Sequence, residues 1–150
     1  MNSETSDSFE LLSRTSLAVG MSQEQIRVLA DCGAVNSYAN GENLVSKDDD
    51  SFDLLVVVDG ACEIRTDMDD LLYRLGRDSL IGEMSFLDHR PRSAKAISSG
   101  GCKAIRFPAS LLNDLEATRP DIVARLLKNI SLVLCQKLRS TTRFAEATFV

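Results

Sequence analysis

The chain contains a single histidine, His89, the residue type that most often serves as a metal ligand and as a general acid or base near neutral pH. Metal-dependent barrel enzymes hold their metal with two or three histidines and a carboxylate, and one histidine cannot supply that set. A Ser/His/Asp or Cys/His nucleophile system would also need His89, which lies beside Arg90 and near Arg92 in a predicted loop. We therefore expect no catalytic residue and no enzymatic activity, and we predict a solvated His89.

Metal-binding and redox motifs are missing as well. The four cysteines are far apart and include no Cys-x-x-Cys pair, which argues against a zinc site and a thioredoxin-like motif. Acidic clusters at residues 48–50 and 67–70 lack the alternating carboxylates and distal glutamate of a calcium loop. We expect no metal and no cofactor. The thiols are predicted to be reduced and mostly buried, at Cys32, Cys62, Cys102 and Cys135.

Long apolar runs and an excess of positive charge are also absent. No stretch approaches the ~18 apolar residues that cross a bilayer, and residues 1–8 lack signal-peptide character. The 17 Lys and Arg residues are outnumbered by 22 Asp and Glu residues, which gives a net charge of −5. DNA-binding surfaces depend on Lys and Arg. We therefore expect a cytoplasmic protein, no membrane partner and no direct contact with DNA.

The N-terminal part of the chain predicts helices. The length of 150 residues corresponds to one domain. Residues 1–8 are polar and predict a disordered leader. Residues 9–33 predict a short helical segment, in which Ser22 and Gln25 have the spacing of a capping box that opens an amphipathic stretch.

From residue 34 to residue 107 the pattern changes to short apolar or alternating runs. Turn residues such as Asp59-Gly60 and Gly100-Gly101 separate the runs. This spacing is typical of a β-sandwich or a jelly-roll barrel. The run at 52–58 is too continuously apolar for an edge strand. The predicted strands are 35–38, 43–46, 52–58, 62–66, 71–75, 93–97 and 102–107.

Helical periodicity returns at residues 108–140. One helix is predicted from Ala109 to Ala117, and Pro120 opens a second, long helix. Its apolar surface is too broad for one barrel to cover, which favours a homodimer formed through this helix. Packing on its own barrel alone is the alternative. Residues 141–150 are predicted to be a tail.

Residues 82–93 suit a phosphate ligand. Gly82 lets the backbone approach a ligand, the following turn offers N–H groups to an anion, and Arg92 has a planar fork that matches phosphate oxygens. Glu83 would repel a bare phosphate, so it favours a ligand that also carries a hydroxyl, as a ribose does. The alternative is that Glu83 is an exposed side chain on the first turn of a short helix and that Arg92 is a solvated surface cation, with no ligand role for either.

This stretch resembles the phosphate-binding cassette of the cyclic-nucleotide-binding domains in the catabolite activator protein, cyclic-nucleotide-dependent kinases and gated channels. The matching elements are Gly82-Glu83 at its start and Pro91-Arg92-Ser93-Ala94 at its end. Arg77-Asp78-Ser79 departs from the family, which often has Pro-Gly-Asp there. That change concerns turn geometry rather than ligand chemistry.

The resemblance implies a role for each cassette residue. Glu83 would accept the ribose 2′-hydroxyl, Arg92 would bind an exocyclic oxygen of the cyclic phosphate, and Ser93 would contact the phosphate or the base. Backbone N–H groups would complete the pocket. The ligand-binding residues implied are Gly82, Glu83, Met84, Ser85, Arg92, Ser93 and Ala94.

The resemblance also implies a fold and a function. The fold would be mostly β with flanking helices: a jelly-roll barrel (double-stranded β-helix) of about eight strands, short N-terminal helices and a long C-terminal helix. The function would be a regulatory sensor for cAMP or cGMP, with cAMP favoured because compact relatives usually sense it. The C-terminal helix would be the lid, and its base contacts are expected among Gln136, Lys137, Arg139 and Ser140.

Two alternatives stay open at this point. A relative of the same fold could serve as a protein-interaction domain that binds no nucleotide, although such a relative is expected to lack Glu83 or Arg92. The chain could also be the sensor half of a larger transcription factor or channel. In each case the effector protein is unknown.

Overall fold

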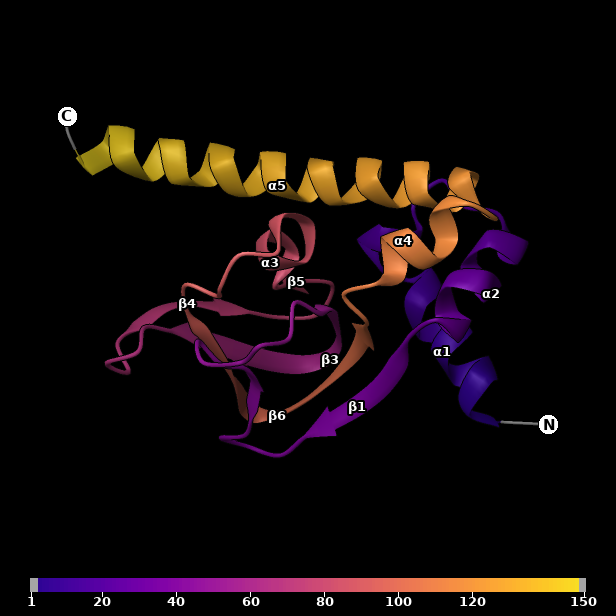
Figure 1. Cartoon of the computed structure of the whole chain (residues 1–150). Helices are drawn as coiled ribbons and strands as arrows, with labels where there is room; N and C mark the ends of the chain where they lie inside the picture. The colour runs from indigo at the N-terminus through magenta and orange to yellow at the C-terminus, as the bar shows by residue number, and fades with distance from the viewer. Residues whose placement is uncertain (1–2, 149–150) are drawn as a thin grey trace.

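One antiparallel sheet with flanking helices forms the molecule (Figure 1). The computed structural model describes residues 3–148, and the side chains of residues 7–141. α5 runs above α3 and the sheet, while α1, α2 and α4 gather at one end. The elements are α1 (Ser3–Ser13), η1 (Ser16–Ala18), α2 (Gln23–Asp31), β1 (Ala34–Tyr38), β2 (Asn43–Val45), β3 (Leu54–Arg65), β4 (Leu71–Leu75), β5 (Leu80–Ile81), α3 (Glu83–Asp88), β6 (Lys95–Phe107), α4 (Leu111–Glu116) and α5 (Pro120–Thr148).

The described strands number six rather than about eight. Two predicted breaks lie inside continuous strands, which merges four of the seven predicted runs into two, and the short strand β5 was not predicted. β3 passes through Asp59-Gly60 and β6 passes through Gly100-Gly101. Their pairing shifts register at this point, as in a β-bulge. A Cβ built on Gly60, at a φ of 78°, would lie 2.2 Å from the carbonyl oxygen of Gly101. The glycines therefore bend paired strands instead of ending them.

The sheet order is β1-β6-β3-β4, with β2 paired to β6 and β5 paired to β3, and the sheet is not closed. β3 is central, as its apolar run predicted. Leu54, Val56 and Val58 face a core shared with the helices. Leu55 and Val57 face a second core on the other side of the sheet. Burial on both sides explains why this strand lacks polar alternation.

The N-terminal segment confirms one prediction and corrects another. The capping box of α2 is present, because Gln25 donates its backbone N–H to Ser22 Oγ at 3.2 Å and accepts from the Ser22 N–H at 2.8 Å. The predicted disordered leader is wrong for residues 3–8, which belong to α1. Leu12 of that helix is fully buried in the core, which stabilises the helix that these polar residues begin. Residues 1 and 2 lie outside the described part.

α5 is longer than predicted. It spans 29 residues and continues through residues 141–148, where a tail was expected. Neither Gly nor Pro interrupts the sequence after Pro120, so nothing there stops the helix. Residues 149 and 150, the end of the predicted tail, lie outside the described part. None of the described helices has the length and apolarity to cross a membrane.

Among the described side chains of α5, the buried ones lie in its first half. Ile122, Leu126 and Ile130 are fully buried against the N-terminal helices and the sheet. Buried Asn129 donates from its amide to the carbonyl oxygens of Leu17 and Val19, at 2.7 and 2.9 Å. The second half therefore extends over the cassette from a fixed base.

The cysteines are free, in agreement with the predicted reduced thiols. Cys62 and Cys102 are buried, Cys32 is partly buried and Cys135 is exposed on α5. The expectation of mostly buried thiols thus holds for two of the four.

Candidate functional site

The cassette begins where β5 ends. Gly82 caps α3 in the left-handed region, at a φ of 78°, and its carbonyl oxygen accepts from the Phe86 N–H at 2.9 Å. Phe86 is almost fully buried and holds this short helix on the core. The chain therefore turns sharply from the sheet into α3 directly beneath α5 (Figure 1).

Arg92 is 4% exposed, so the alternative of a solvated surface cation is wrong. Its Nη2 donates to the carbonyl oxygen of Asp53 at 2.9 Å. Nε and Nη1 are buried and have no hydrogen-bond partner among the described residues. Burial, the largest cause, lowers the pKa of this guanidinium. Unsatisfied buried donors on a charged group are costly, so this geometry is suited to an anion.

Two neighbours fix the guanidinium in place. A Cβ built on Gly82 would lie 2.1 Å from Arg92 Nη1, so only glycine leaves room for the side chain against the backbone. Asp53 holds the other side through its carbonyl oxygen. The Asp53 carboxylate in turn accepts from Arg106 Nη1 at 2.9 Å and from the Ala109 N–H at 3.0 Å.

Glu83 is 5% exposed and forms an ion pair with Lys137 of α5 through its Oε1 atom. The same ammonium group donates to the carbonyl oxygen of Leu80 at 3.2 Å. Glu83 is thus a buried carboxylate that accepts from Lys137, and it is not an exposed side chain on the first turn of α3.

A cavity of about 110 Å³ lies between these groups. Its polar lining includes Glu83, Ser85, Arg92 and Ser93 of the cassette and two lysines, Lys95 and Lys137. Apolar side chains from the strands supply the rest, among them Val45, Ile64 and Leu75.

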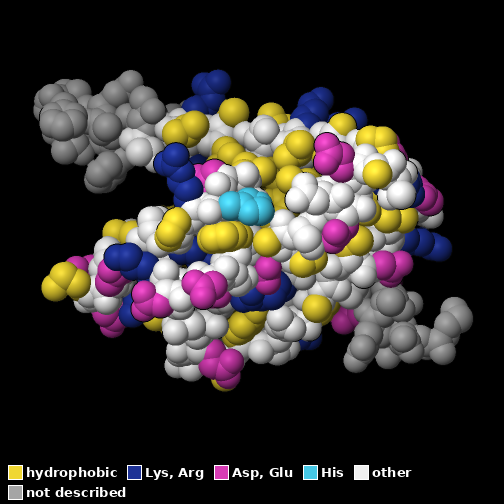
Figure 2. All heavy atoms as spheres, in the orientation of Figure 1, with side chains coloured by type: hydrophobic (Ala, Val, Ile, Leu, Met, Phe, Trp, Pro, Cys, Tyr) yellow, Lys and Arg dark blue, Asp and Glu magenta, His cyan; other side chains and the backbone are white. Residues whose placement is uncertain are grey.

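A second cavity of about 530 Å³ follows under the C-terminal half of α5. Tyr73, Leu75, Leu80 and Lys137 line both cavities, so the two adjoin. Figure 2 shows the surface hollowed below this part of the helix. The two volumes together form a groove between α5 and the sheet.

The structure brings the seven predicted cassette residues to one cavity. The Met84 side chain is 65% exposed, so that residue contributes chiefly through its backbone. Of the four predicted α5 residues, Lys137 lines both cavities, and Gln136 and Ser140 line the larger one. Arg139 is exposed and lines neither of these two cavities.

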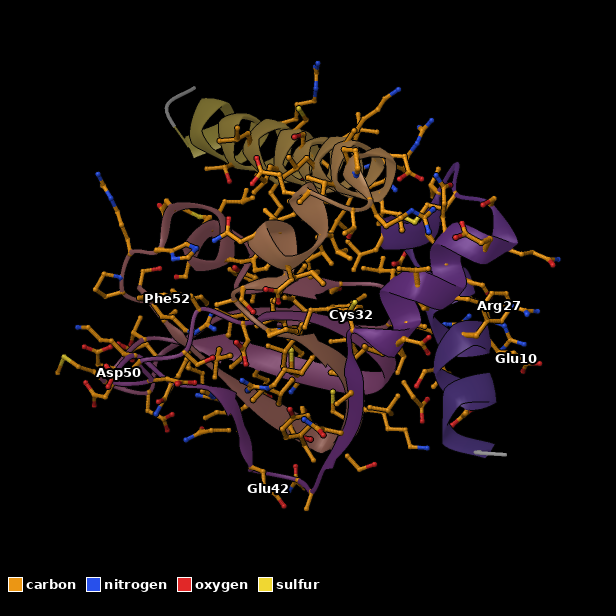
Figure 3. All side chains as sticks on the ribbon, turned by 45° about the vertical axis from the view of Figure 1, so that its right-hand side comes forward. Glu10, Arg27, Cys32, Glu42, Asp50 and Phe52 are labelled. Carbon is orange, nitrogen blue, oxygen red and sulfur yellow. The ribbon has the colours of Figure 1, made fainter. Side chains whose placement is uncertain are left out.

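His89 is exposed, as predicted, and its ring lies 5.4 Å from that of Phe52 between centroids. Phe52 precedes β3 and lies beside the loop that follows α3 (Figure 3). Within the described residues, no group of three or more His, Cys, Asp or Glu side chains could hold a metal ion.

Sequence reasoning missed the strand residues that line the smaller cavity, and it also missed Asp53, which contacts Arg92. Asp53 holds Arg92 from 39 positions away, and Tyr73 lines both cavities from an exposed strand. An aspartate before an apolar strand gives no signal of this contact. Tyr73 is one of only two tyrosines, in an alternating run that predicted a strand and nothing more.

The fold and the geometry are those of a β-sheet domain with a partly polar cavity beneath a long helix. The chain belongs to the cyclic nucleotide-binding domain family, whose model matches residues 35–119. The resemblance seen in the cassette is thereby confirmed for the domain that contains it.

Individual relatives agree with this family. The chain is 25% identical over 136 residues to a CRP-like cAMP-activated global transcriptional regulator of Mycobacterium tuberculosis, covering 88% of this chain and 59% of the relative. It therefore spans about three-fifths of the length of the curated relatives that it matches.

Solved structures share the fold. A cyclic nucleotide-binding domain from Methylobacillus flagellatus superposes with a TM-score of 0.83 at 21% identity, covering 96% of this chain and 83% of the other. The regulatory subunit of a cAMP-independent protein kinase A from Trypanosoma brucei superposes with a TM-score of 0.74 at 10% identity, covering 97% and 50%. At these identities the likeness concerns the fold alone.

Proposed function

We propose that this domain is a receptor for a cyclic mononucleotide and regulates a partner without catalysing a reaction. The observation that carries the proposal is Arg92, whose buried Nε and Nη1 donors lack partners beside an open cavity. A cyclic phosphate supplies the negative charge and the acceptor oxygens that these donors need. Backbone N–H groups of Met84, Ser85 and Ser93 assist at the start of α3 and after Arg92.

The ribose and the base have separate places in this proposal. Glu83 accepts the 2′-hydroxyl, and Ser93 contacts the phosphate or the base. The base extends under α5, where Gln136 and Ser140 line the larger cavity. α5 thus acts as the lid and as the element that transmits binding to a partner.

We propose cAMP as the preferred ligand over cGMP. The curated relative in Mycobacterium tuberculosis is cAMP-activated, which supports this choice. Calorimetric titration with both nucleotides tests it, and a tenfold preference for cGMP would contradict it.

The competing function is an interaction domain that binds no nucleotide. The Trypanosoma brucei relative is described as cAMP-independent, so the fold by itself does not decide the ligand. The orphan donors of Arg92 favour the nucleotide, because a domain without that ligand gains nothing from burying them. Absence of binding by either nucleotide in the same titration would support the competing function.

The proposed partners are an effector protein and a second copy of the chain, in the cytoplasm, with no DNA and no membrane contact by the described residues. Exposed leucines on α5 support self-association, because Leu132 is 54% and Leu138 is 68% exposed. The chain spans 59% of the length of its curated relative. The same proposal therefore includes a role for this domain as the sensor half of a larger regulator. Sedimentation equilibrium of the chain and of a Leu132→Asp/Leu138→Asp variant tests the dimer, which the double substitution should dissociate.

A further inference from the structure

Lys137 joins the second half of α5 to the cassette. Its ammonium group binds the Glu83 carboxylate and the Leu80 carbonyl oxygen together. The Glu83 side chain is 7% exposed and that of Lys137 is 34% exposed. An ion pair buried on one side is screened less than a surface pair, so this contact holds the helix down.

The same side chain divides the groove. Lys137 lines both the cavity of about 110 Å³ at the cassette and the cavity of about 530 Å³ under α5. Small-molecule ligands generally occupy pockets of ~300–1,000 Å³. A nucleotide held by Arg92 therefore needs room beyond the smaller cavity, and Lys137 lies along that path.

The two ends of the smaller cavity are in different states. Arg92 offers two buried donors without protein partners, whereas Glu83 already has a cation on Oε1. The donors at the phosphate end have no partner among the described residues, whereas one carboxylate oxygen at the hydroxyl end already pairs with the protein's own ammonium group.

From this asymmetry we infer that Lys137 is an internal latch, which a ligand hydroxyl displaces from Glu83. The inference rests on the proposed function and adds to it a role for one ligand group. The 2′-hydroxyl of the nucleotide replaces the ammonium group as the donor to Glu83, and Lys137 leaves the groove. The C-terminal half of α5 then takes a new position, while buried Asn129 keeps the first half fixed.

The latch separates binding from signalling. A cyclic nucleotide without the 2′-hydroxyl still satisfies Arg92 but leaves the pair between Glu83 and Lys137 intact. Such a ligand binds without repositioning α5.

The ligand-free protein provides the first test. Lys137→Met removes the charge and keeps a side chain of similar length, and it should speed amide hydrogen exchange in residues 133–141 about fivefold, as loss of a partly buried ion pair predicts. The matched control is Lys128→Met, because Lys128 is exposed on the same helix. Glu83→Gln should have the same effect as Lys137→Met, and the double variant should add little. Unchanged exchange in Lys137→Met would overturn the latch, whatever the protein binds.

Titration with cAMP provides the second test. Lys137→Met should bind cAMP about fivefold more tightly than the wild type does. The control Lys128→Met should bind cAMP with the affinity of the wild type. Weaker binding by Lys137→Met would show that Lys137 contacts the nucleotide, and the latch would be wrong. In the wild type, saturating cAMP should change exchange in residues 133–141 and saturating 2′-deoxy-cAMP should not. If neither the wild type nor the variants bind either nucleotide, the proposed function is wrong, and so is the release of Lys137 from Glu83 by a ligand hydroxyl. Amide hydrogen exchange in the ligand-free protein would still show whether the ion pair between Lys137 and Glu83 holds α5.

Discussion

Two arginines two positions apart have opposite environments. Arg92 is buried with unsatisfied donors, and Arg90 is exposed in the loop. We predict that Arg92→Ala weakens cAMP binding by ~2–5 kcal/mol, the cost of truncating one partner of a charge pair sealed from water. Arg90→Ala should cost no more than ~1 kcal/mol. Isothermal titration measures both, and equal losses would show that the cassette register is wrong.

Burial of one thiol predicts a pH dependence of stability. Burial, with Cys102 as a further cause, raises the pKa of Cys62 from 9.0 to about 12. Between these values the unfolded chain loses the thiol proton and the folded chain keeps it. The free energy of unfolding should therefore fall as pH rises above ~9, by at most ~1.4 kcal/mol per pH unit from this group.

Cys62→Ala isolates that contribution. Tyr73 and Cys102 also have raised pKa values, so only the difference in slope between variant and wild type belongs to Cys62. Urea unfolding at pH 8, 9 and 10 should give a shallower fall for the variant. Parallel curves would mean that the Cys62 pKa is not raised.

At the scale of residues, the sequence could predict the parts of the site that lie close together in the chain. Glu83 and Arg92 stand in one short motif, and each residue type has a chemical reason to be there. The pair between Glu83 and Lys137 spans 54 positions, and the bond from Arg92 to Asp53 spans 39. Both arise from how elements pack, which no local pattern records.

At the scale of elements, the bend shared by β3 and β6 depends on Gly60. A Cβ there would meet the Gly101 carbonyl oxygen at 2.2 Å, whereas Gly41, also at positive φ, has nothing within 4 Å. Gly41→Ala should cost ~1–2 kcal/mol, from the left-handed backbone alone. Gly60→Ala should cost ~1–3 kcal/mol more, because overpacking adds to that strain. Urea denaturation compares them, and equal losses would show that the bulge has room for a side chain.

The side-chain amide of Asn129 adds a polar anchor to the apolar packing of α5. Asn129→Ala removes the donor from two carbonyl oxygens, those of Leu17 and Val19. We expect a loss of ~1–3 kcal/mol for each carbonyl left buried and unsatisfied. Asn113→Ala, in an exposed position of α4, is the control and should be nearly neutral. Thermal unfolding measures both changes. A near-neutral Asn129→Ala would show that water replaces the amide.

Element boundaries could be predicted only in part. The capping box located α2, because its signal lies within four residues. Asp-Gly and Gly-Gly predicted turns at sites that proved to be bulges, since glycine permits both structures and only the strand partner selects between them. The helices at residues 3–8 and 141–148 were missed, because each continues a better-packed helix through residues with little apolar signal.

For the whole molecule, ligand and stability are coupled. A ligand that binds only the folded state adds ~2.7 kcal/mol at a hundredfold excess over its Kd. We therefore expect cAMP to raise the melting temperature of the wild type and to leave Arg92→Ala unshifted at the same concentration. Scanning calorimetry or dye-based melting tests this, and no shift with millimolar cAMP or cGMP would contradict the proposed ligands.

The order of helices, sheet and helices could be predicted from periodicity along the chain, and the cassette fell where β5 leads into α3. The open sheet of six described strands could not be predicted. Four of the predicted apolar runs join into the two long strands β3 and β6, and this joining depends on the pairing between those strands, which the local sequence does not record.

The exposed thiol of Cys135 has a practical consequence. It stands two residues before Lys137 on the half of α5 that overlies the groove, while Cys62 and Cys102 are buried. A maleimide fluorophore placed there would report on the environment of this helix in real time. With Cys32 replaced to remove the remaining partly accessible thiol, the label would sit at a single accessible cysteine, and its fluorescence would report the ligand-dependent movement of α5 that the proposal expects.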